Sequence, residues 1–313
     1  MKHFAHMDVA SFDEAVKNSS AISWLIAGGT DLLGTLKDEM LRNYPEKLVN
    51  LKTIPDAAYI KEDGNAVRIG ALTKVKDVAA DDTIKTKFAC LAEAAGKVAS
   101  PTIRSMGTIG GNICQMHRCW YFRSANDRFD CYRKGGDYCP AMIGDSRYHS
   151  IFGNLDGCYA VSSQETAPAL IVLGATVVTN EREIPAEEFF AAAVPRSNVL
   201  EDNEVVKEIT VPNKTFKSAF YKFALRKSID FALVSCAAAV GEDGAIKIAL
   251  GGVYPTPWRS TSAEGAVGGS ISADSAKAAG DAAVADASPL SENSYKVEIA
   301  RALVERTLLA IPN

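Results

Sequence analysis

The sequence lacks several features that would assign the protein to a large class. No run of about eighteen apolar residues occurs, so no transmembrane helix is expected. The opening residues, MKHFAHMDVASF, lack an apolar segment followed by a small-residue cleavage site, and no signal peptide is expected. The net charge is only −4, which argues against a nucleic-acid or anionic-membrane partner. Neither GxGxxG nor GxxxxGK[ST] occurs, so neither a Rossmann nor a P-loop nucleotide site follows.

What is present indicates a globular α+β protein. The 313 residues are 47% hydrophobic, enough for more than one domain, and the pattern changes near residue 215. A strand, a glycine turn and a helix start are expected across 23–33, and a helix across 84–99. The segment 231–259 alternates as an antiparallel hairpin with its turn at 242–244, and two helices are expected within 272–287 and 293–311. Ser11 and Glu14 form a candidate capping box for an early helix.

Two diglycine turns stand out. They are Ala27–Asp31 and Thr108–Asn112, and each follows an apolar run and carries a threonine beside its glycines. Glycine allows positive φ and lets backbone N–H groups approach an anion closely, as phosphate-binding turns require. A single Gly-Gly pair is more often an ordinary tight turn. Spacing in the chain does not show whether the two turns meet in space.

Cysteines are crowded into one segment. Five of the seven lie between 114 and 158, inside a stretch at 113–160 that has no sustained helical or strand period. The odd total of seven cysteines in the chain argues against a disulfide framework. A [4Fe–4S] cluster needs four thiolates, and the five candidates are Cys114, Cys119, Cys131, Cys139 and Cys158. No CxxC pair occurs among them, so structural zinc, with His117 or His149 as a further ligand, is a weaker alternative. Cys90 and Cys236 lie in apolar patterns typical of core packing.

The two turns also carry a family resemblance. The stretches LIAGGTDLL and TIGGNI, followed in order by APALIVLGA, EVVKEITVP and YKFALRK, resemble the FAD-binding medium subunits of the molybdenum hydroxylase family, which includes xanthine and CO dehydrogenases. The resemblance implies a two-lobed FAD-binding domain of the vanillyl-alcohol-oxidase (PCMH) type over 1–214, with lobes of about 1–55 and 56–214 and an insert of about 113–160. It implies a C-terminal α+β domain over 215–313, built on a three-stranded antiparallel sheet with helices.

The resemblance also implies a set of FAD contacts. Glu165 stands where the family usually has aspartate, and Lys222 matches a lysine beside the flavin, where its charge would stabilise an anionic reduced flavin. The competing interpretation of Lys222 is a solvated strand lysine. The implied contacts are Leu25, Ile26, Ala27, Gly28, Gly29, Thr30, Asp31, Leu32, Val98, Thr108, Gly110, Gly111, Asn112, Glu165 and Lys222.

The cysteine segment resembles the insert of a minority of this family. RCWYFR, CYRKGGDYC and RYHSIFGNLDGC are similar to the [4Fe–4S] insert of the flavin subunits of periplasmic aldehyde oxidoreductase and 4-hydroxybenzoyl-CoA reductase. The resemblance implies that the cluster ligands are Cys119, Cys131, Cys139 and Cys158. Cys114 is the reserve candidate, because it directly follows the second glycine turn.

The implied function is that of an electron-transfer flavoprotein subunit. A large molybdopterin subunit and a small [2Fe–2S] subunit would be its partners, electrons would pass through FAD to an external acceptor, and no acid or base of this chain would be catalytic. Two alternatives remain open: a free-standing FAD oxidoreductase, and a non-enzymatic scaffold stabilised by zinc. A cytoplasmic location is expected, or a periplasmic one if a partner carries a twin-arginine signal.

Overall fold

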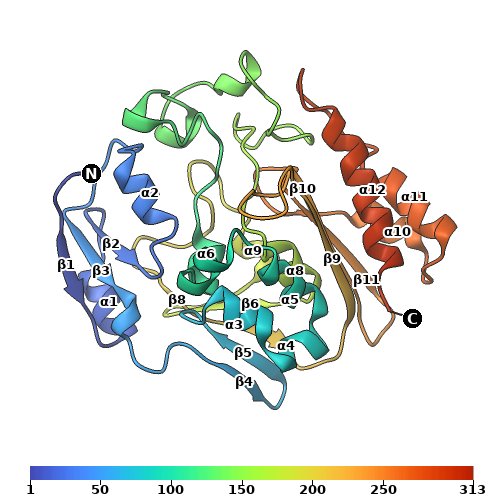
Figure 1. Cartoon of the computed structure of the whole chain (residues 1–313), viewed down its shortest axis with the longest axis horizontal. Helices are drawn as coiled ribbons and strands as arrows, with labels where there is room; N and C mark the ends of the chain where they lie inside the picture. The colour runs from blue at the N-terminus through green and yellow to red at the C-terminus, as the bar shows by residue number, and fades with distance from the viewer. Residues whose placement is uncertain (313) are drawn as a thin grey trace.

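The fold contains three β-sheets and a long irregular insert. A computed structural model describes residues 1–312. The N-terminal sheet lies at the left of Figure 1, the second sheet at the lower centre and the C-terminal sheet at the right, while the insert crosses the top in green. The mixed composition of helices and strands agrees with the predicted α+β class. In the described part of the chain, no helix combines the length and apolar character needed to cross a bilayer.

The N-terminal sheet is parallel and delivers the first glycine turn. Its strands lie in the order β1–β3–β2, and β2 leads through the turn into α2, as predicted. Ser11 caps α1 by accepting a hydrogen bond from the Glu14 N–H at 3.1 Å, while the Glu14 carboxylate accepts from Ala10 N rather than Ser11 N. The elements are β1 (Ala5–Asp8), α1 (Phe12–Asn18), β2 (Ser23–Ile26), α2 (Leu32–Lys37) and β3 (Lys47–Asn50).

The second sheet has five antiparallel-paired strands in the order β4–β5–β8–β6–β7. The single helix predicted over 84–99 is wrong. Two helices meet at Phe88, whose φ of −134° and ψ of 53° are not helical, because its fully buried ring packs into the core. The strands are β4 (Ile60–Asp63), β5 (Ala66–Gly70), β6 (Thr176–Thr179), β7 (Glu183–Pro185) and β8 (Val206–Pro212). The helices are α3 (Val75–Ala80), α4 (Asp82–Lys87), α5 (Ala89–Gly96), α6 (Pro101–Met106), α7 (Ile109–Cys114), α8 (Ala167–Val172) and α9 (Ala186–Phe189).

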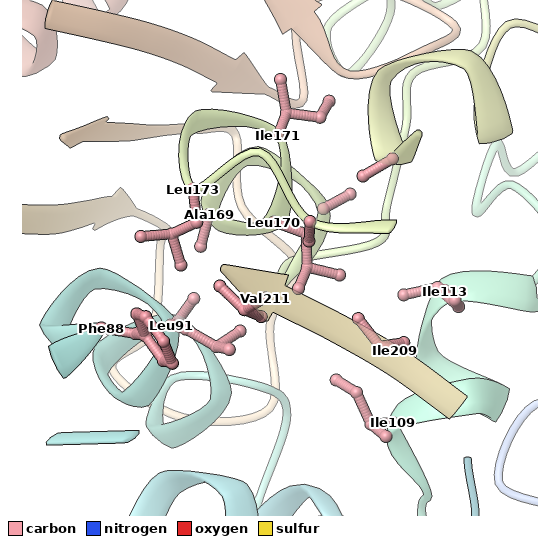
Figure 2. Close-up of a cluster of buried hydrophobic side chains, with 14 of the residues drawn as sticks. Phe88, Leu91, Ile109, Ile113, Ala169, Leu170, Ile171, Leu173, Ile209 and Val211 are labelled. Carbon is pink, nitrogen blue, oxygen red and sulfur yellow. The ribbon is translucent and has the colours of Figure 1, made fainter. Parts of the chain in front are cut away.

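The largest core fixes the position of the second glycine turn. In Figure 2, Ile209 and Val211 of β8 lie between α8 and the segments that carry Phe88, Leu91, Ile109 and Ile113. Ile109 and Ile113 are four residues apart, so both point from the same face of α7 into this core. Gly110 packs on Ala71 of this core, and Gly111 lies on the exposed side of α7.

The C-terminal part pairs an antiparallel sheet with helices, as predicted, but the sheet has four strands rather than three, and α10 adds a helix that was not predicted. Its order is β12–β11–β10–β9, and the missed strand, β12, has only two residues because the preceding Pro255 and Pro257 limit its pairing. The predicted hairpin is β10 and β11. The elements are β9 (Lys217–Phe223), β10 (Val234–Val240), β11 (Ile246–Gly251), β12 (Trp258–Arg259), α10 (Thr261–Val267), α11 (Ala273–Ala283) and α12 (Tyr295–Leu309).

The insert is ordered by contacts to other parts of the chain. Between α7 and α8 it contains only three short 3₁₀ turns, at Ala125–Asp127, Tyr132–Lys134 and Pro140–Met142. The buried Lys296 ammonium of α12 donates to the carbonyls of His149 at 2.9 Å and Gly252 at 2.6 Å, and Asn293 donates to the carbonyls of His149 and Ser150. Burial lowers the pKa of Lys296 to about 7. The C-terminal segment thus supplies hydrogen bonds that a loop without regular structure needs.

Candidate functional site

The first glycine turn packs directly against the chain that precedes the second. A Cβ atom placed on Gly28 would lie 2.2 Å from the carbonyl oxygen of Met106 and 2.9 Å from the Cα of Gly107. Gly29 has a φ of +71°, a conformation that glycine adopts without strain. Only a residue without a side chain therefore allows this contact at position 28.

The second turn is the start of α7. The Thr108 hydroxyl accepts a hydrogen bond from Gly111 N at 3.1 Å and caps the helix. A Cβ on Gly110 would lie 2.9 Å from the Ala71 carbonyl oxygen, so this glycine permits close packing on the loop after β5. The turn is therefore held on one side by Ala71 and on the other by the first turn.

Both turns line one cavity of about 440 Å³. The two glycine turns therefore lie together in space, which their separation along the chain could not show. Of the residues predicted to contact FAD, Gly110 and Lys222 do not line the cavity. Those that do are Leu25, Ile26, Ala27, Gly28, Gly29, Thr30, Asp31, Leu32, Val98, Thr108, Gly111, Asn112 and Glu165. Sequence reasoning missed Arg104, Arg118 and Phe231, which also line it and come from segments with no glycine signature.

Asp31 ties the first turn to the insert. Its carboxylate forms ion pairs with the guanidinium groups of Arg118 at 2.8 Å and Arg123 at 2.7 Å, and accepts a hydrogen bond from Met116 N at 3.0 Å. The Asp31 side chain therefore holds the start of the insert against the cavity. Arg118 remains at the cavity wall, where its charge faces any bound anion.

Glu165 and Lys222 form a buried ion pair beside the cavity. Lys222 also donates to the carbonyls of Lys97 at 2.9 Å and Asp230 at 2.6 Å, so the interpretation as a solvated strand lysine is wrong. Burial raises the pKa of Glu165 to about 7, although Lys222 opposes the shift. Glu165 thus places a carboxyl group at the cavity wall, and Lys222 reaches the cavity only through it.

The raised pKa of Glu165 predicts a specific dependence of stability on pH. A carboxyl group whose pKa is higher in the folded state favours folding at low pH, and this contribution is lost as pH rises through the folded pKa. Relative to Glu165→Gln, the wild-type chain should lose up to about 3 kcal/mol of unfolding free energy between pH 4.5 and 8. Thermal-unfolding midpoints of both proteins across this range measure the difference.

Glu204→Gln provides the matched control. The Arg182 guanidinium holds the pKa of Glu204 down at about 2, so this carboxylate is ionised throughout the same range. Its removal should change the midpoint by an amount that does not vary between pH 5 and 8. Parallel midpoint curves for wild type and Glu165→Gln would contradict the role assigned to Glu165.

Four cysteines of the insert surround a second, small cavity. Cys119, Cys131, Cys139 and Cys158 all line it, together with a shell that includes Tyr121, Phe122, Tyr132 and Pro140. All seven cysteines of the chain are free thiols. Cys114 lies elsewhere, at the wall of the cavity formed by the glycine turns.

Hydrogen-bond donors point at these four sulfur atoms. Burial raises the pKa of the Cys119 thiol to about 12, against the opposing effect of the Phe122 and Tyr121 backbone N–H groups. Burial likewise raises the pKa values of Cys131 and Cys139, against backbone N–H groups that donate to their sulfurs. Cys158 Sγ accepts from the buried Arg133 guanidinium at 3.1 Å and from Ala160 N at 3.4 Å. For Cys114, burial alone raises the pKa to about 12. Donors aimed at sulfur are a feature of ligating thiolates.

The two histidines of the insert have different surroundings. His117 is buried, and its ring nitrogens already contact Ser197 Oγ at 3.0 Å and the Pro255 carbonyl at 2.6 Å. His149 Nε2 lies 3.2 Å from Cys119 Sγ. Within residues 1–312, no group of three or more His, Cys, Asp or Glu side chains is arranged to hold a single metal ion.

Comparison with known proteins agrees with this geometry. Residues 2–214 match the family described as the FAD binding domain in molybdopterin dehydrogenase, and residues 219–311 match the CO dehydrogenase flavoprotein C-terminal domain. The chain is 31% identical to the aldehyde oxidoreductase FAD-binding subunit PaoB of Escherichia coli, over 99% of this chain and 98% of that protein. It is 29% identical to the carbon monoxide dehydrogenase medium chain of Hydrogenophaga pseudoflava, over 91% and 88% of the two chains.

A solved structure extends the likeness to three dimensions. The carbon monoxide dehydrogenase of Hydrogenophaga pseudoflava that lacks the Mo-pyranopterin moiety superposes with a TM-score of 0.76 at 27% identity, covering 99% of this chain and 97% of that chain. The family match and the fold define an FAD-binding oxidoreductase. More narrowly, the chain belongs to the FAD-binding family of molybdopterin dehydrogenases, whose medium chains share both of its domains.

Proposed function

We propose that the chain is the electron-transferring flavoprotein subunit of a heteromeric molybdenum hydroxylase and carries an additional [4Fe–4S] cluster. The observation that carries the flavin part is the meeting of both glycine turns in one cavity, where Gly28 packs on the carbonyl of Met106. When bound, FAD would supply the exchange of electrons one or two at a time. We assign no acid or base catalyst to this chain.

The residues of the cavity fit FAD by charge and shape. Backbone N–H groups at Gly28–Gly29 are suited to the pyrophosphate, and Arg118 adds a cation at the wall. In the second turn, Gly110 N and Gly111 N already donate to the Ala71 carbonyl and the Thr108 hydroxyl, so this turn contributes the wall at Thr108 and Gly111 rather than those N–H groups. Glu165 is the acceptor for flavin hydroxyl or ring N–H groups. Lys222 holds the Glu165 carboxylate in place through their ion pair, and so acts on the flavin only indirectly. The apolar side chains of Leu25, Ile26, Leu32 and Val98 are suited to the ring systems. The full contact set predicted from the resemblance remains the proposed site.

The four-cysteine cavity is the proposed [4Fe–4S] site. Each cysteine of such a cluster binds a different iron, so its ligands stand farther apart than the four donors around one zinc ion. Convergence of Cys119, Cys131, Cys139 and Cys158, each with an N–H donor at its sulfur, supports this set. The aromatic shell would limit water access and the buried Arg133 would offset cluster charge.

The proposal also includes two partner subunits and a division of the chain into two domains. A molybdopterin-binding large subunit and a [2Fe–2S] small subunit would feed electrons to FAD, in keeping with the names of the medium chains and subunits to which this chain is similar. We keep the division at 214/215, supported by the passage from β8 of one sheet to β9 of another, and the PCMH-type lobes of about 1–55 and 56–214. We assign the complex to the cytoplasm, with export on a partner's twin-arginine signal as the alternative.

Composition of the native complex tests the proposal. Anaerobic purification of the tagged chain from its own source should yield two further subunits, one FAD per chain and about four irons on this chain after the subunits are separated. Molybdenum should be found only in the large partner. A chain that binds flavin but purifies alone would favour the free-standing oxidoreductase, and a chain with zinc and no flavin would overturn the proposal altogether.

A further inference from the structure

Two lysines bind the main chain where the glycine turns meet. The Lys52 ammonium donates to the carbonyl of Ala27, the residue before Gly28, at 3.1 Å. The Lys74 ammonium donates to the carbonyl of Met106, just ahead of the second turn, at 3.2 Å. Neither lysine lines the FAD cavity. Both ammonium groups therefore act on a ligand in the cavity only through the turns that they hold.

Each lysine is tied to the turn that it serves. The Lys52 ammonium also donates to Asn50 Oδ1 at 2.5 Å, and the same oxygen accepts from Lys52 N at 3.2 Å. Asn50 ends β3, the strand that pairs with β2 ahead of the first turn. The backbone of Lys74 forms a bridge with Thr108, which begins the second turn. The two carbonyl contacts are thus fixed by the fold on both sides of the junction.

The contact of Lys52 sets the direction of one N–H group. In a planar trans peptide, the carbonyl of one residue and the N–H of the next point in opposite directions. Because the Ala27 carbonyl points at Lys52, the Gly28 N–H points away from that lysine. Gly28 lines the cavity, and its N–H has no hydrogen-bond partner within residues 1–312. This N–H is therefore available to an anion in the cavity.

The contact of Lys74 fixes the distance between the turns. The Met106 carbonyl oxygen is the atom on which Gly28 packs, since a Cβ there would lie 2.2 Å from it. Gly107 N already donates to the Ile103 carbonyl at 2.7 Å, so Lys74 frees no N–H for a ligand. Lys74 instead holds the Met106 oxygen in place against the first turn.

The two ammonium groups also repel one another. Burial lowers the pKa values of both lysines, and the charge of Lys52 lowers the pKa of Lys74 further. Two like charges beside the junction are unfavourable while the cavity holds no anion. A pyrophosphate on the other side of the turns carries negative charge that offsets this repulsion.

We propose that Lys52 and Lys74 are positioning residues for the pyrophosphate of FAD. They hold the two carbonyls at the junction, direct the Gly28 N–H to the cavity and add positive charge from behind the turns. This inference rests on the proposed function, because it requires the pyrophosphate to lie against the glycine turns.

Calorimetric titration of the complex, freed of its flavin, tests the inference with FAD and with ADP, which keeps a pyrophosphate but has no flavin. Lys52→Met and Lys74→Met each remove the ammonium and keep an unbranched side chain. Each variant should weaken the binding of FAD about three- to ten-fold, and the binding of ADP by the same factor. The effect is no larger because Lys52 is exposed and Lys74 is half-buried, so water screens their charges.

Thermal unfolding of the same flavin-free proteins separates positioning from simple support of the fold. Lys74→Met should unfold at a midpoint no lower than that of the wild type, because the substitution relieves the repulsion with Lys52. A lysine that only supports the fold would lower the midpoint and leave the affinities for FAD and ADP unchanged.

Lys76→Met is the matched control. Lys76 is exposed and its charge also acts on Lys74, but it binds neither carbonyl within the described residues. This variant should stay within about two-fold of the wild-type affinity. Equal FAD affinity in the wild type, Lys52→Met and Lys74→Met would overturn the inference, as would a loss for FAD with no matching loss for ADP. A wild-type complex that takes up no FAD would instead defeat the proposed function.

Discussion

Gly28→Ala should yield a folded chain that has lost at least about ten-fold in affinity for FAD. The added methyl group would lie 2.2 Å from the Met106 carbonyl oxygen, a backbone atom that cannot swing aside as a side chain does. The first turn must therefore move away from the second, and a pyrophosphate can no longer contact both. Flavin content after gel filtration, and titration of the flavin-free chain with FAD, measure the loss.

Gly34→Ala is the matched control, since a Cβ there would meet no atom within 4 Å and the position lies in α2. This variant should keep its flavin and gain slightly in stability, because alanine favours helices more than glycine does. If both variants bind FAD as the wild type does, the two turns do not form the cradle described above.

Cys158→Ser should reduce the iron of the chain from about four atoms to nearly none. Serine is a poor ligand for iron, and the substitution also removes the sulfur that accepts from Arg133 and Ala160. FAD content should stay near the wild-type value, because Cys158 does not line the flavin cavity. Iron and sulfide analysis and the electron paramagnetic resonance of the reduced protein report the cluster directly.

Cys114→Ala separates the two possible ligand sets. This cysteine lines the flavin cavity, stands apart from the four-cysteine cavity and has no N–H donor acting on the pKa of its sulfur. The variant should retain all four irons. Loss of the cluster in Cys114→Ala together with its retention in Cys158→Ser would reverse the assignment.

Local signals in the sequence were sufficient for much of the fold. The strand, turn and helix around Gly28, the hairpin of β10 and β11, and helices α11 and α12 all follow from glycine placement and hydrophobic period. The break at Phe88 was missed because burial of one ring outweighed the helical period of its neighbours. Strand β12 was missed because two residues directly after Pro255 and Pro257 carry no period.

The site was predictable only where a residue acts through its own backbone or a known motif. The glycine turns have that character, but their contact depends on Met106 and on the folding of two sheets, which no local pattern encodes. Asp31 shows the limit most clearly: it belongs to the turn motif, yet its carboxylate binds arginines that lie almost ninety positions later. The insert was recognisable by its cysteines, but its shape is set by partners distant in the chain, such as Asp31, Asn293 and Lys296.

The anchoring of the insert by the segment 292–296 has a consequence for biogenesis. Ser146 N donates to the Glu292 carboxylate, and the carbonyls of His149 and Ser150 accept from Asn293 and Lys296, residues that are synthesised long after the insert. Synthesis runs from the N-terminus, so the cysteine segment emerges long before its supports exist. If the insert holds the proposed [4Fe–4S] cluster, these supports form only after the segment 292–296 has been made, and a truncation that removes them would impair metal loading as well as the C-terminal domain.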